Sequence, residues 1–187
     1  NGYNIAIRTK SELDELYQNS FKLIYIGLES GSQKILDLCQ KRSKVSEMIH
    51  AVHCAHSSMI KASVIVLLGL GGRELSSVHV QETIRALNEM QPRYLSFLSL
   101  MLIPGTPLYE ERTNGLFREL SAQELLQEMY DIIAGLDLKK TIFRTDHASN
   151  YLPLEGRFPV DKNRLLDEIA DALHGKSDLR HEFLRGL

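Results

Sequence analysis

Short apolar runs alternate along the chain with longer segments in which apolar residues recur at helical spacing. The runs over residues 23–28 and 62–68 contain no charged residue and no strict polar alternation. Such runs are typical of parallel strands that are buried on both faces. A third strand is expected over residues 94–102. Strands separated by helical segments predict an α/β fold with a mainly parallel sheet.

The helical segments follow from the spacing of their apolar residues. Ser32 is expected to cap a helix whose buried face holds Ile35 and Leu36. Pro92 marks the end of a later helix. Besides the helix that follows Ser32, helices are predicted over residues 46–57, 77–90, 122–136 and 161–173.

The remaining segments carry turn and loop signals. Pro104 and Pro107 flank Gly-Thr, which predicts a rigid turn with no regular element. A strand is expected over residues 141–144, followed by a polar loop over 145–153. The charged tail from residue 175 is expected to fray. The strand–helix unit recurs at about 40 residues, a spacing that suits successive units of a βα barrel.

Composition narrows the class of protein. The chain has 187 residues, 43% of them apolar, and its formal net charge is 22 − 24 = −2. This balance excludes a protein whose affinity for nucleic acid rests on a global excess of basic residues, so no nucleic-acid partner is predicted. The apolar stretches fall short of the roughly 18–20 residues of a membrane span, and no membrane partner or signal peptide is predicted.

The chain contains two cysteines, Cys39 and Cys54, and begins with Asn1 rather than Met. Two widely spaced cysteines predict no disulfide framework and a reducing, cytoplasmic compartment. They also supply neither the four thiolates of a structural zinc site nor the cysteine triplet of an iron–sulfur cluster. The first residues look like the interior of a longer protein.

Polar residues and glycines follow the predicted strands, where ligands bind in parallel α/β proteins. Glu29 and Ser30 precede a helix start, which suits a ligand with ribose hydroxyls and a charged end. The glycines of residues 69–72 let main chain approach a flat ligand closely. The alternatives are a helix-dipole role for Glu29, turn chemistry for Ser30 and a flexible turn for the glycines.

These strand ends resemble the radical S-adenosylmethionine (SAM) enzymes, in particular the methylthiotransferase-like and oxygen-independent coproporphyrinogen III oxidase-like branches. Ile26-Gly27-Leu28-Glu29-Ser30-Gly31-Ser32, with Lys41 twelve residues after Glu29, resembles their fourth-strand region. Gly69-Leu70-Gly71-Gly72-Arg73-Glu74 is similar to their fifth-strand glycine motif, with one extra residue before Glu74. Leu102-Ile103-Pro104-Gly105-Thr106-Pro107-Leu108 looks like the end of their sixth strand.

The resemblance implies a partial (βα)6 TIM-type barrel that holds about the third to sixth strands, with residues 1–9 as the third. Residues 1–120 would form this half barrel, and residues 121–187 a C-terminal extension packed on it. The resemblance assigns SAM binding to Glu29, Ser30, Lys41, Gly69, Gly71, Leu102 and Ile103. Lys41, whose alternative role is that of a solvated helix-end lysine, would neutralise the carboxylate of the cofactor.

The family's Cys-x3-Cys-x2-Cys loop, which holds a [4Fe–4S] cluster, does not occur in this sequence. We therefore expect the C-terminal part of an iron–sulfur oxidoreductase, in which the cluster belongs to the full-length protein only. The full enzyme would use a 5′-deoxyadenosyl radical, whereas this chain alone would be inactive. A cluster-free relative is the alternative account.

Two further groups of polar residues are candidate sites. His50 and Cys54 share one helix face and His53 and His56 another, and this split predicts no metal site. The polar residues around 144–151 are candidates for substrate contact, with a surface loop ordered by Asx turns as the alternative. The substrate-binding candidates are Arg144, His147 and Asn150.

Two other functions fit the same pattern. The first is a βα-barrel enzyme that binds a phosphorylated metabolite at the glycines of residues 69–72. The second is a non-enzymatic interaction module. In a half barrel, an exposed sheet edge predicts either dimerisation or coverage of this edge by the chain's own tail. No feature of the sequence identifies the substrate.

Overall fold

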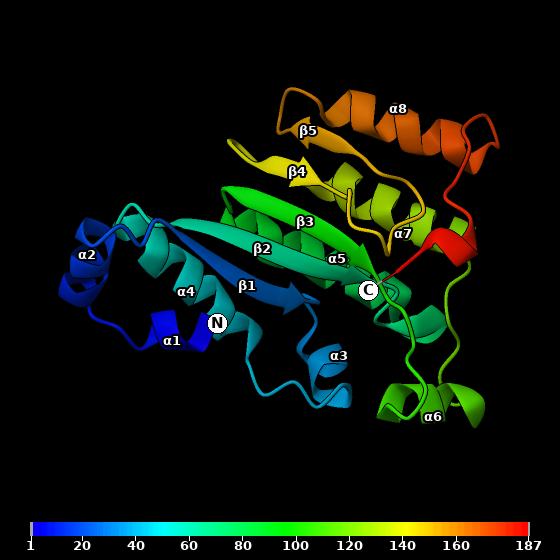
Figure 1. Ribbon diagram of the computed structural model, residues 1–187, viewed down its shortest axis with the longest axis horizontal. Coiled ribbons are helices and arrows are strands. Elements are labelled where there is room, and N and C mark those ends of the chain that lie inside the picture. The colour runs from blue at the N-terminus through cyan, green and yellow to red at the C-terminus, as the bar shows by residue number, and fades with distance from the viewer. Residues whose placement is uncertain (1, 187) are drawn as a thin grey trace.

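The computed structural model describes residues 2–186 and has one five-stranded sheet (Figure 1). The strands follow each other across the sheet in chain order. β1 to β4 are parallel, and β5 runs antiparallel to β4. Their bounds are β1 Leu23–Glu29, β2 Lys61–Leu68, β3 Tyr94–Ser99, β4 Ile142–Arg144 and β5 Glu155–Arg157. The predicted α/β class with a mostly parallel sheet is confirmed.

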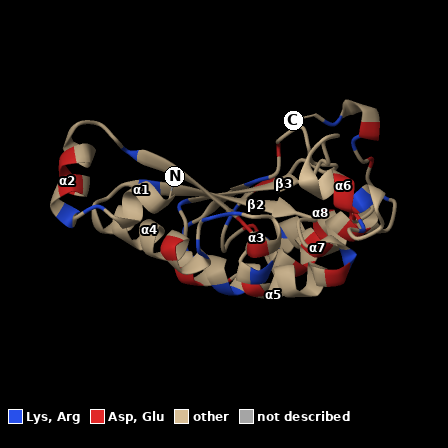
Figure 2. Cartoon of the chain, turned by 90° about the horizontal axis from the view of Figure 1, so that it is seen from below, with Lys and Arg blue, Asp and Glu red and all other residues tan. Residues whose placement is uncertain are grey.

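The helices connect the strands and cover one face of the sheet. Figure 2 shows α4, α5 and α7 beneath this face. The helices are α1 Gly2–Ala6, α2 Lys10–Gln18, α3 Gln33–Leu38, α4 Val45–Ser57, α5 Gly72–Met90, α6 Pro107–Thr113, α7 Ala122–Gly135 and α8 Lys162–Leu173, with a 3-10 turn η1 at Glu182–Leu184.

Strand residues alternate between the helix-covered face and an open face. Ile24 and Ile26 of β1 are buried toward the helices, whereas Tyr25 between them is 64% exposed. The register aligns Tyr25, Ser63, Tyr94 and Ile142 across the open face. The expectation that β1 is buried on both faces was wrong, because the described helices cover only one face. An open face is the geometry expected of a partial barrel.

Residues 1–9 do not form the expected third strand. Gly2–Ala6 is helix α1, which packs on α4, and Asn1 lies outside the described residues. Gly2 lies close to the side chains of Met48 and Ala51. This packing, which the local sequence does not reveal, favours a helix. The three strands assigned by resemblance to the fourth, fifth and sixth positions are β1, β2 and β3.

The boundaries of several elements differ from the predictions. α5 begins at Gly72, five residues before the expected start, and β3 ends at Ser99 rather than at residue 102. The predicted turn at residues 104–108 instead leads into α6, with Pro107 in the first turn of the helix. Proline is tolerated there because that N–H has no intrahelical partner. The short strand β5 and helix α2 were not predicted.

The tail after residue 175 docks onto the loop that follows β4. The Arg185 side chain is 5% exposed and donates hydrogen bonds to the Ser149 carbonyl (2.7 Å) and the Tyr151 hydroxyl (2.6 Å). Arg180 donates to the His147 carbonyl (3.0 Å). The expectation of a frayed tail was wrong, because two arginines satisfy carbonyl groups of this loop.

Packing of α7 and α8 attaches the C-terminal part of the chain to the sheet and to α5. α7 packs on both α5 and α8, and Leu125, Met129 and Ile133 of α7 lie in the same core as β2 and β3. Within residues 2–186, no helix is both long and apolar enough to span a bilayer.

Candidate functional site

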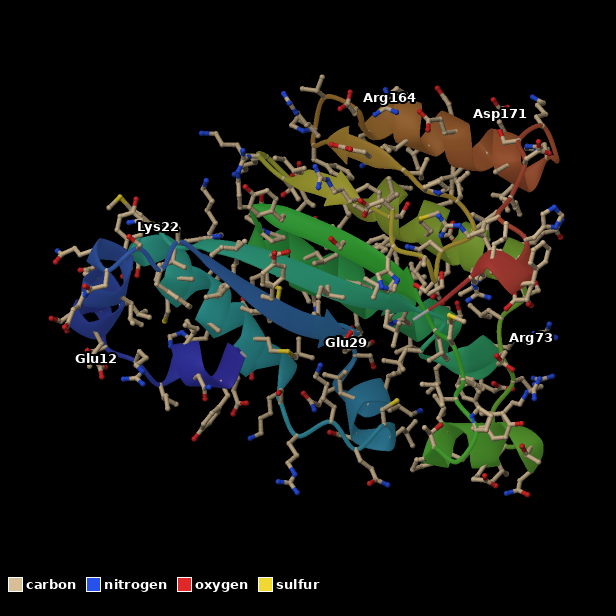
Figure 3. All side chains as sticks on the ribbon, in the orientation of Figure 1. Glu12, Lys22, Glu29, Arg73, Arg164 and Asp171 are labelled. Carbon is tan, nitrogen blue, oxygen red and sulfur yellow. The ribbon has the colours of Figure 1, made fainter. Side chains whose placement is uncertain are left out.

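The end of β1 places a carboxylate and an ammonium group side by side. Lys41 Nζ lies 3.0 Å from Glu29 Oε1 and donates a 2.6 Å hydrogen bond to the Gly27 carbonyl. The side chains are 25% and 29% exposed, so both still reach solvent. Figure 3 shows Glu29 at the carboxyl end of β1. Glu29 and Lys41, which the resemblance assigns to the same cofactor, thus form an ion pair.

The backbone around Glu29 is shaped for this pair. Glu29 has φ +59°, and the β1–β2 register shifts between Gly27 and Glu29. A Cβ atom on Gly27 would lie 2.2 Å from Glu29 Oε1. Gly27 therefore leaves the space that the Glu29 carboxylate occupies, and the bulge turns this side chain toward Lys41.

Ser30 points away from solvent. It is fully buried, its Oγ lies 2.8 Å from His79 Nδ1, and it accepts a 3.0 Å hydrogen bond from the Ser32 N–H. The neighbouring Gly31 N–H donates to Thr83 Oγ1 at 3.0 Å. Ser30 thus fastens the loop after β1 to helix α5, and its hydroxyl is already engaged within the protein.

The end of β2 is held by a buried carboxylate from α7. Gly69 has φ +81°, and its N–H donates a 2.6 Å hydrogen bond to Glu128 Oε1. The other oxygen, Glu128 Oε2, accepts from the Ser76 hydroxyl. His79 Nε2 lies 3.7 Å from Glu128 Oε1 and has no hydrogen-bond partner in the described part of the chain.

Burial shifts both groups of this pair toward their neutral forms. It lowers the pKa of His79 to about 4. It raises the pKa of Glu128 to about 7, against the opposing effect of the hydrogen bonds from Ser76 and Gly69. Near neutral pH, His79 is uncharged and Glu128 is poised between its two states. Together they link the loops after β1 and β2.

The other predicted cofactor residues also follow the carboxyl ends of the parallel strands. Gly71 immediately precedes α5, and a Cβ there would approach the Leu75 backbone to 3.0 Å. Leu102 and Ile103 lie in the irregular segment after β3, and Ile103 is 45% exposed. Thr106 donates hydrogen bonds from its N–H and hydroxyl to the Ile103 carbonyl (3.2 and 2.7 Å).

The three candidate substrate residues have different surroundings. Arg144 is exposed and pairs with Glu155 at 3.3 Å. His147 is exposed, and its Nδ1 lies 3.0 Å from Ser149 Oγ. Asn150 is buried and donates from its amide to the Phe97 (2.7 Å) and Thr145 (3.0 Å) carbonyls. Asn150 therefore anchors the loop to β3, and its amide group is engaged within the protein.

The structure joins some of the predicted residues and adds two others. Glu29 meets Lys41 directly, whereas Ser30 and Gly69 are connected through His79 and Glu128. Sequence reasoning missed this buried pair because its members lie 49 residues from Ser30 and 59 residues from Gly69 along the chain. A histidine and a glutamate on otherwise apolar helix faces were the only signal available.

The residues that the structure describes contain no group of three or more His, Cys, Asp or Glu placed to hold a metal ion. Cys39 and Cys54 are free thiols on different helical segments. Burial raises the pKa of the Cys39 thiol. These side chains do not fit an iron–sulfur cluster.

Comparison with known proteins found similarity to a curated protein and to solved structures. No family model matches the chain. The uncharacterized protein MJ0486 of Methanocaldococcus jannaschii is 28% identical over 170 residues, which cover 88% of this chain and 52% of that protein. The chain thus spans about half the length of the curated relative it matches.

A solved structure shares the fold. It is archaeal Elp3 of Methanocaldococcus infernus with an N-terminal deletion (1–46), at a TM-score of 0.63 and 19% identity. The match covers 90% of this chain and 39% of that chain. The partial barrel is therefore an arrangement already seen in a solved protein.

Proposed function

We propose that this chain is part of a radical SAM iron–sulfur oxidoreductase and lines the adenosine and amino acid side of the SAM site. The fold similarity to Elp3, a radical SAM enzyme, supports the class. The observation that carries the proposal is the Glu29–Lys41 pair at the end of β1. A carboxylate and an ammonium group 3.0 Å apart are complementary to the zwitterionic amino acid end of SAM.

The residues present fit SAM but do not fit the cluster. Glu29 would accept from the ammonium group of the cofactor, and Lys41 would donate to its carboxylate. Gly27 leaves room for the Glu29 carboxylate beside Lys41. SAM, reduced by an iron–sulfur cluster, supplies hydrogen-atom abstraction. In our proposal this chain binds, orients and shields the cofactor and has no activity alone.

The second function considered from the sequence receives no support at its proposed site. A phosphate bound at residues 69–72 would need backbone N–H groups that point into a cationic or neutral environment. The Gly69 N–H instead binds the carboxylate of Glu128. An anion at this N–H would face that carboxylate, so we do not assign phosphate binding to the glycine segment.

Replacing Lys41 by methionine tests the proposed SAM site. We expect the Lys41→Met variant to lose about tenfold or more in affinity for SAM, because a charge-assisted hydrogen bond is lost. Affinity for 5′-methylthioadenosine, which lacks the amino acid end, should stay within about twofold. Titration calorimetry with both ligands measures this difference.

The control for that titration is Arg42→Met, which removes a neighbouring charge that does not contact Glu29. It should leave the affinity for SAM unchanged. If the unaltered chain binds neither ligand, or if Lys41→Met weakens both ligands equally, the proposed site is wrong. A Cys-x3-Cys-x2-Cys loop in the upstream coding sequence would independently support the proposal.

Dimerisation through the sheet edge remains a prediction. β1 forms one edge of the five-stranded sheet, and Tyr25 on this strand is exposed. An unpaired edge of this length offers backbone groups to a second strand. We expect the isolated chain to dimerise at micromolar concentration, and Tyr25→Lys to shift it toward monomer by adding charge repulsion across the interface. Sedimentation that shows a monomer at every concentration would contradict this.

A further inference from the structure

A buried chain of polar side chains runs from helix α7 to the loop that follows Glu29. Glu128 of α7 accepts from the Gly69 N–H, and His79 Nε2 of α5 lies 3.7 Å from Glu128 Oε1. On its other side, His79 Nδ1 lies 2.8 Å from Ser30 Oγ. The side chains of His79 and Glu128 have no exposed surface. Three side chains therefore connect a buried carboxyl group to the residue next to Glu29.

The hydrogen bonds of this chain fix where its protons lie. Ser30 Oγ accepts from the Ser32 N–H at 3.0 Å, so the Ser30 hydroxyl can donate its own proton to His79 Nδ1. A neutral histidine has one ring proton, and its position is set by the partner of the other nitrogen. The His79 proton then lies on Nε2, which faces Glu128 Oε1. The protons of the chain thus point toward the Glu128 carboxyl group.

The chain ends beside a residue in a strained backbone conformation. Glu29 has φ +59°, which is costly for a residue with a Cβ and persists only where the surrounding structure fixes it. Two side chains of α5 fix the loop that follows. His79 contacts Ser30, and Thr83 Oγ1 accepts from the Gly31 N–H at 3.0 Å. The direction of the Glu29 carboxylate therefore depends on how firmly α5 holds this loop.

Ser76 connects the buried carboxyl group of Glu128 to solvent. It is half-buried, it lines a cavity of about 220 Å³ between α5 and α7, and its hydroxyl donates to Glu128 Oε2. The other charged residues of this cavity are Arg73, Glu124 and Asp131, and neither α8 nor the sheet contributes one. Arg73 pairs with Glu124 at 3.0 Å. The proton of Glu128 can therefore exchange with water through one hydroxyl group.

Glu128 changes its charge near neutral pH. Burial raises its pKa to about 7, the charge of Asp131 adds to this rise, and the hydrogen bonds from Ser76 and Gly69 oppose it. His79 faces Glu128 from α5 and is uncharged at this pH, because burial lowers its pKa to about 4. Within the chain of three side chains, the charge therefore changes at Glu128 when the pH passes through neutrality.

We propose that His79, through Ser30, positions Glu29 for the amino acid end of SAM, and that this positioning is strongest when the facing carboxyl group of α7 is ionised. An ionised Glu128 attracts the His79 Nε2 proton and keeps Nδ1 as the acceptor for Ser30. When Glu128 is protonated, the ring proton can move to Nδ1, and the Ser30 hydroxyl then loses its acceptor. The inference rests on the proposed SAM function and adds regulation of that site by a proton.

A purely structural role for the same groups makes a different prediction. In that role the chain joins α5 and α7 to the strand ends, and its proton affects the stability of the fold but not the affinity for a ligand. Glu128→Gln separates the two roles. Glutamine keeps the shape of the side chain and an acceptor for the Gly69 N–H, but it does not ionise.

The test is titration calorimetry of the chain with SAM and with 5′-methylthioadenosine at about pH 6 and pH 7.5, on either side of the pKa of Glu128. If the ionised form binds SAM about tenfold more tightly, the affinity for SAM should be about fourfold higher at the higher pH. The affinity for 5′-methylthioadenosine, which lacks the amino acid end, should change less than about twofold. Glu128→Gln should lose the rise, and titration of SAM itself cancels in this comparison.

The Gly69 N–H reports the charge of Glu128 without any ligand. Its amide resonance should shift with a midpoint near pH 7 in the unaltered chain and should show no such shift in Glu128→Gln. Ser76→Ala should move the midpoint to higher pH by removing a hydrogen bond to the ionised form, and Asp131→Asn should move it to lower pH by removing a negative charge. The midpoint of the SAM affinity should move in the same two directions. These two variants decide the question if Glu128→Gln does not fold.

Glu15→Gln is the control, because Glu15 is an exposed carboxylate on α2. It should change neither midpoint. An equal pH dependence of SAM affinity in the unaltered chain and in Glu128→Gln would overturn this inference and leave the proposed SAM site intact. An equal pH dependence for SAM and 5′-methylthioadenosine would also overturn it, because the effect would then not act through Glu29. Absence of SAM binding at both pH values would instead overturn the proposed function, and this inference with it.

Discussion

Gly31→Ala is expected to destabilise the fold by about 4 kcal/mol or to prevent folding. A Cβ on Gly31 would lie 2.1 Å from the Glu82 carbonyl oxygen and 2.5 Å from Thr83 Cα. Both are backbone atoms of α5, so no side chain can move aside to relieve the clash. Overpacking of this kind forces backbone shifts and gives the largest effects seen for single substitutions. Urea denaturation of the variant measures the loss.

The control for that measurement is Gly2→Ala in α1. A Cβ on Gly2 would meet its neighbours at 3.5–3.7 Å, which is ordinary van der Waals contact. We expect unchanged stability or a gain of up to about 1 kcal/mol, since alanine favours the helix over glycine. Stability of Gly31→Ala within about 1 kcal/mol of the unaltered chain would show that the loop after β1 does not press on α5 as described.

The second large effect is the dependence of stability on pH at His79 and Glu128. Burial raises the pKa of Glu128 to about 7 from 4.5. The contribution of this carboxyl to stability is therefore complete below pH 4.5 and is lost as pH rises through 7. Burial lowers the pKa of His79 to about 4 from 6.5, so its contribution is complete above pH 6.5 and is lost as pH falls through 4.

The two slopes have opposite sign and cancel between about pH 4.5 and 6.5. Removing one group exposes the slope of the other. With Glu128→Gln, stability relative to the unaltered chain should rise with pH through this window by about 1 kcal/mol per pH unit. With His79→Gln, relative stability should fall as pH rises from about 4 to 6.5, the range between the folded and unfolded pKa values of His79. Denaturation midpoints measured at several pH values test both signs.

Glu89→Gln is the matched control, because Glu89 is an exposed carboxylate on the same helix as His79. Its relative stability should not change with pH in this window. Parallel curves for the His79→Gln and Glu128→Gln variants would show that the two groups are not shifted in opposite directions.

Local pattern predicted most of the regular elements, while contacts between distant segments decided the exceptions. The apolar runs of β1 and β2 and the amphipathic face of α7 carry their own signal. The segment Gly2–Ala6 contains residues that suit a strand, yet it is a helix, because Met48 and Ala51 of α4 offer it a packing surface. Packing of this kind overrides local preference in short segments.

In the candidate site, too, some features follow from local sequence and others from contacts between distant segments. The resemblance assigned Glu29 and Lys41 to the same cofactor but predicted no contact between them, and the structure brings their charged groups together. The resemblance assigned Ser30 to the cofactor, whereas the Ser30 hydroxyl lies beside His79 in the interior. The sequence does not specify the face of the loop on which Ser30 lies, because that depends on how α5 crosses the loop.

The contact between α7 and the end of β2 also bears on cooperativity. Glu128 binds the Gly69 N–H, and Leu125 lies against Gly69. A peptide-bond cleavage in the segment between α6 and α7 would therefore leave two pieces whose buried groups still contact each other. Such pieces would remain associated under native conditions and would melt in one calorimetric transition rather than two.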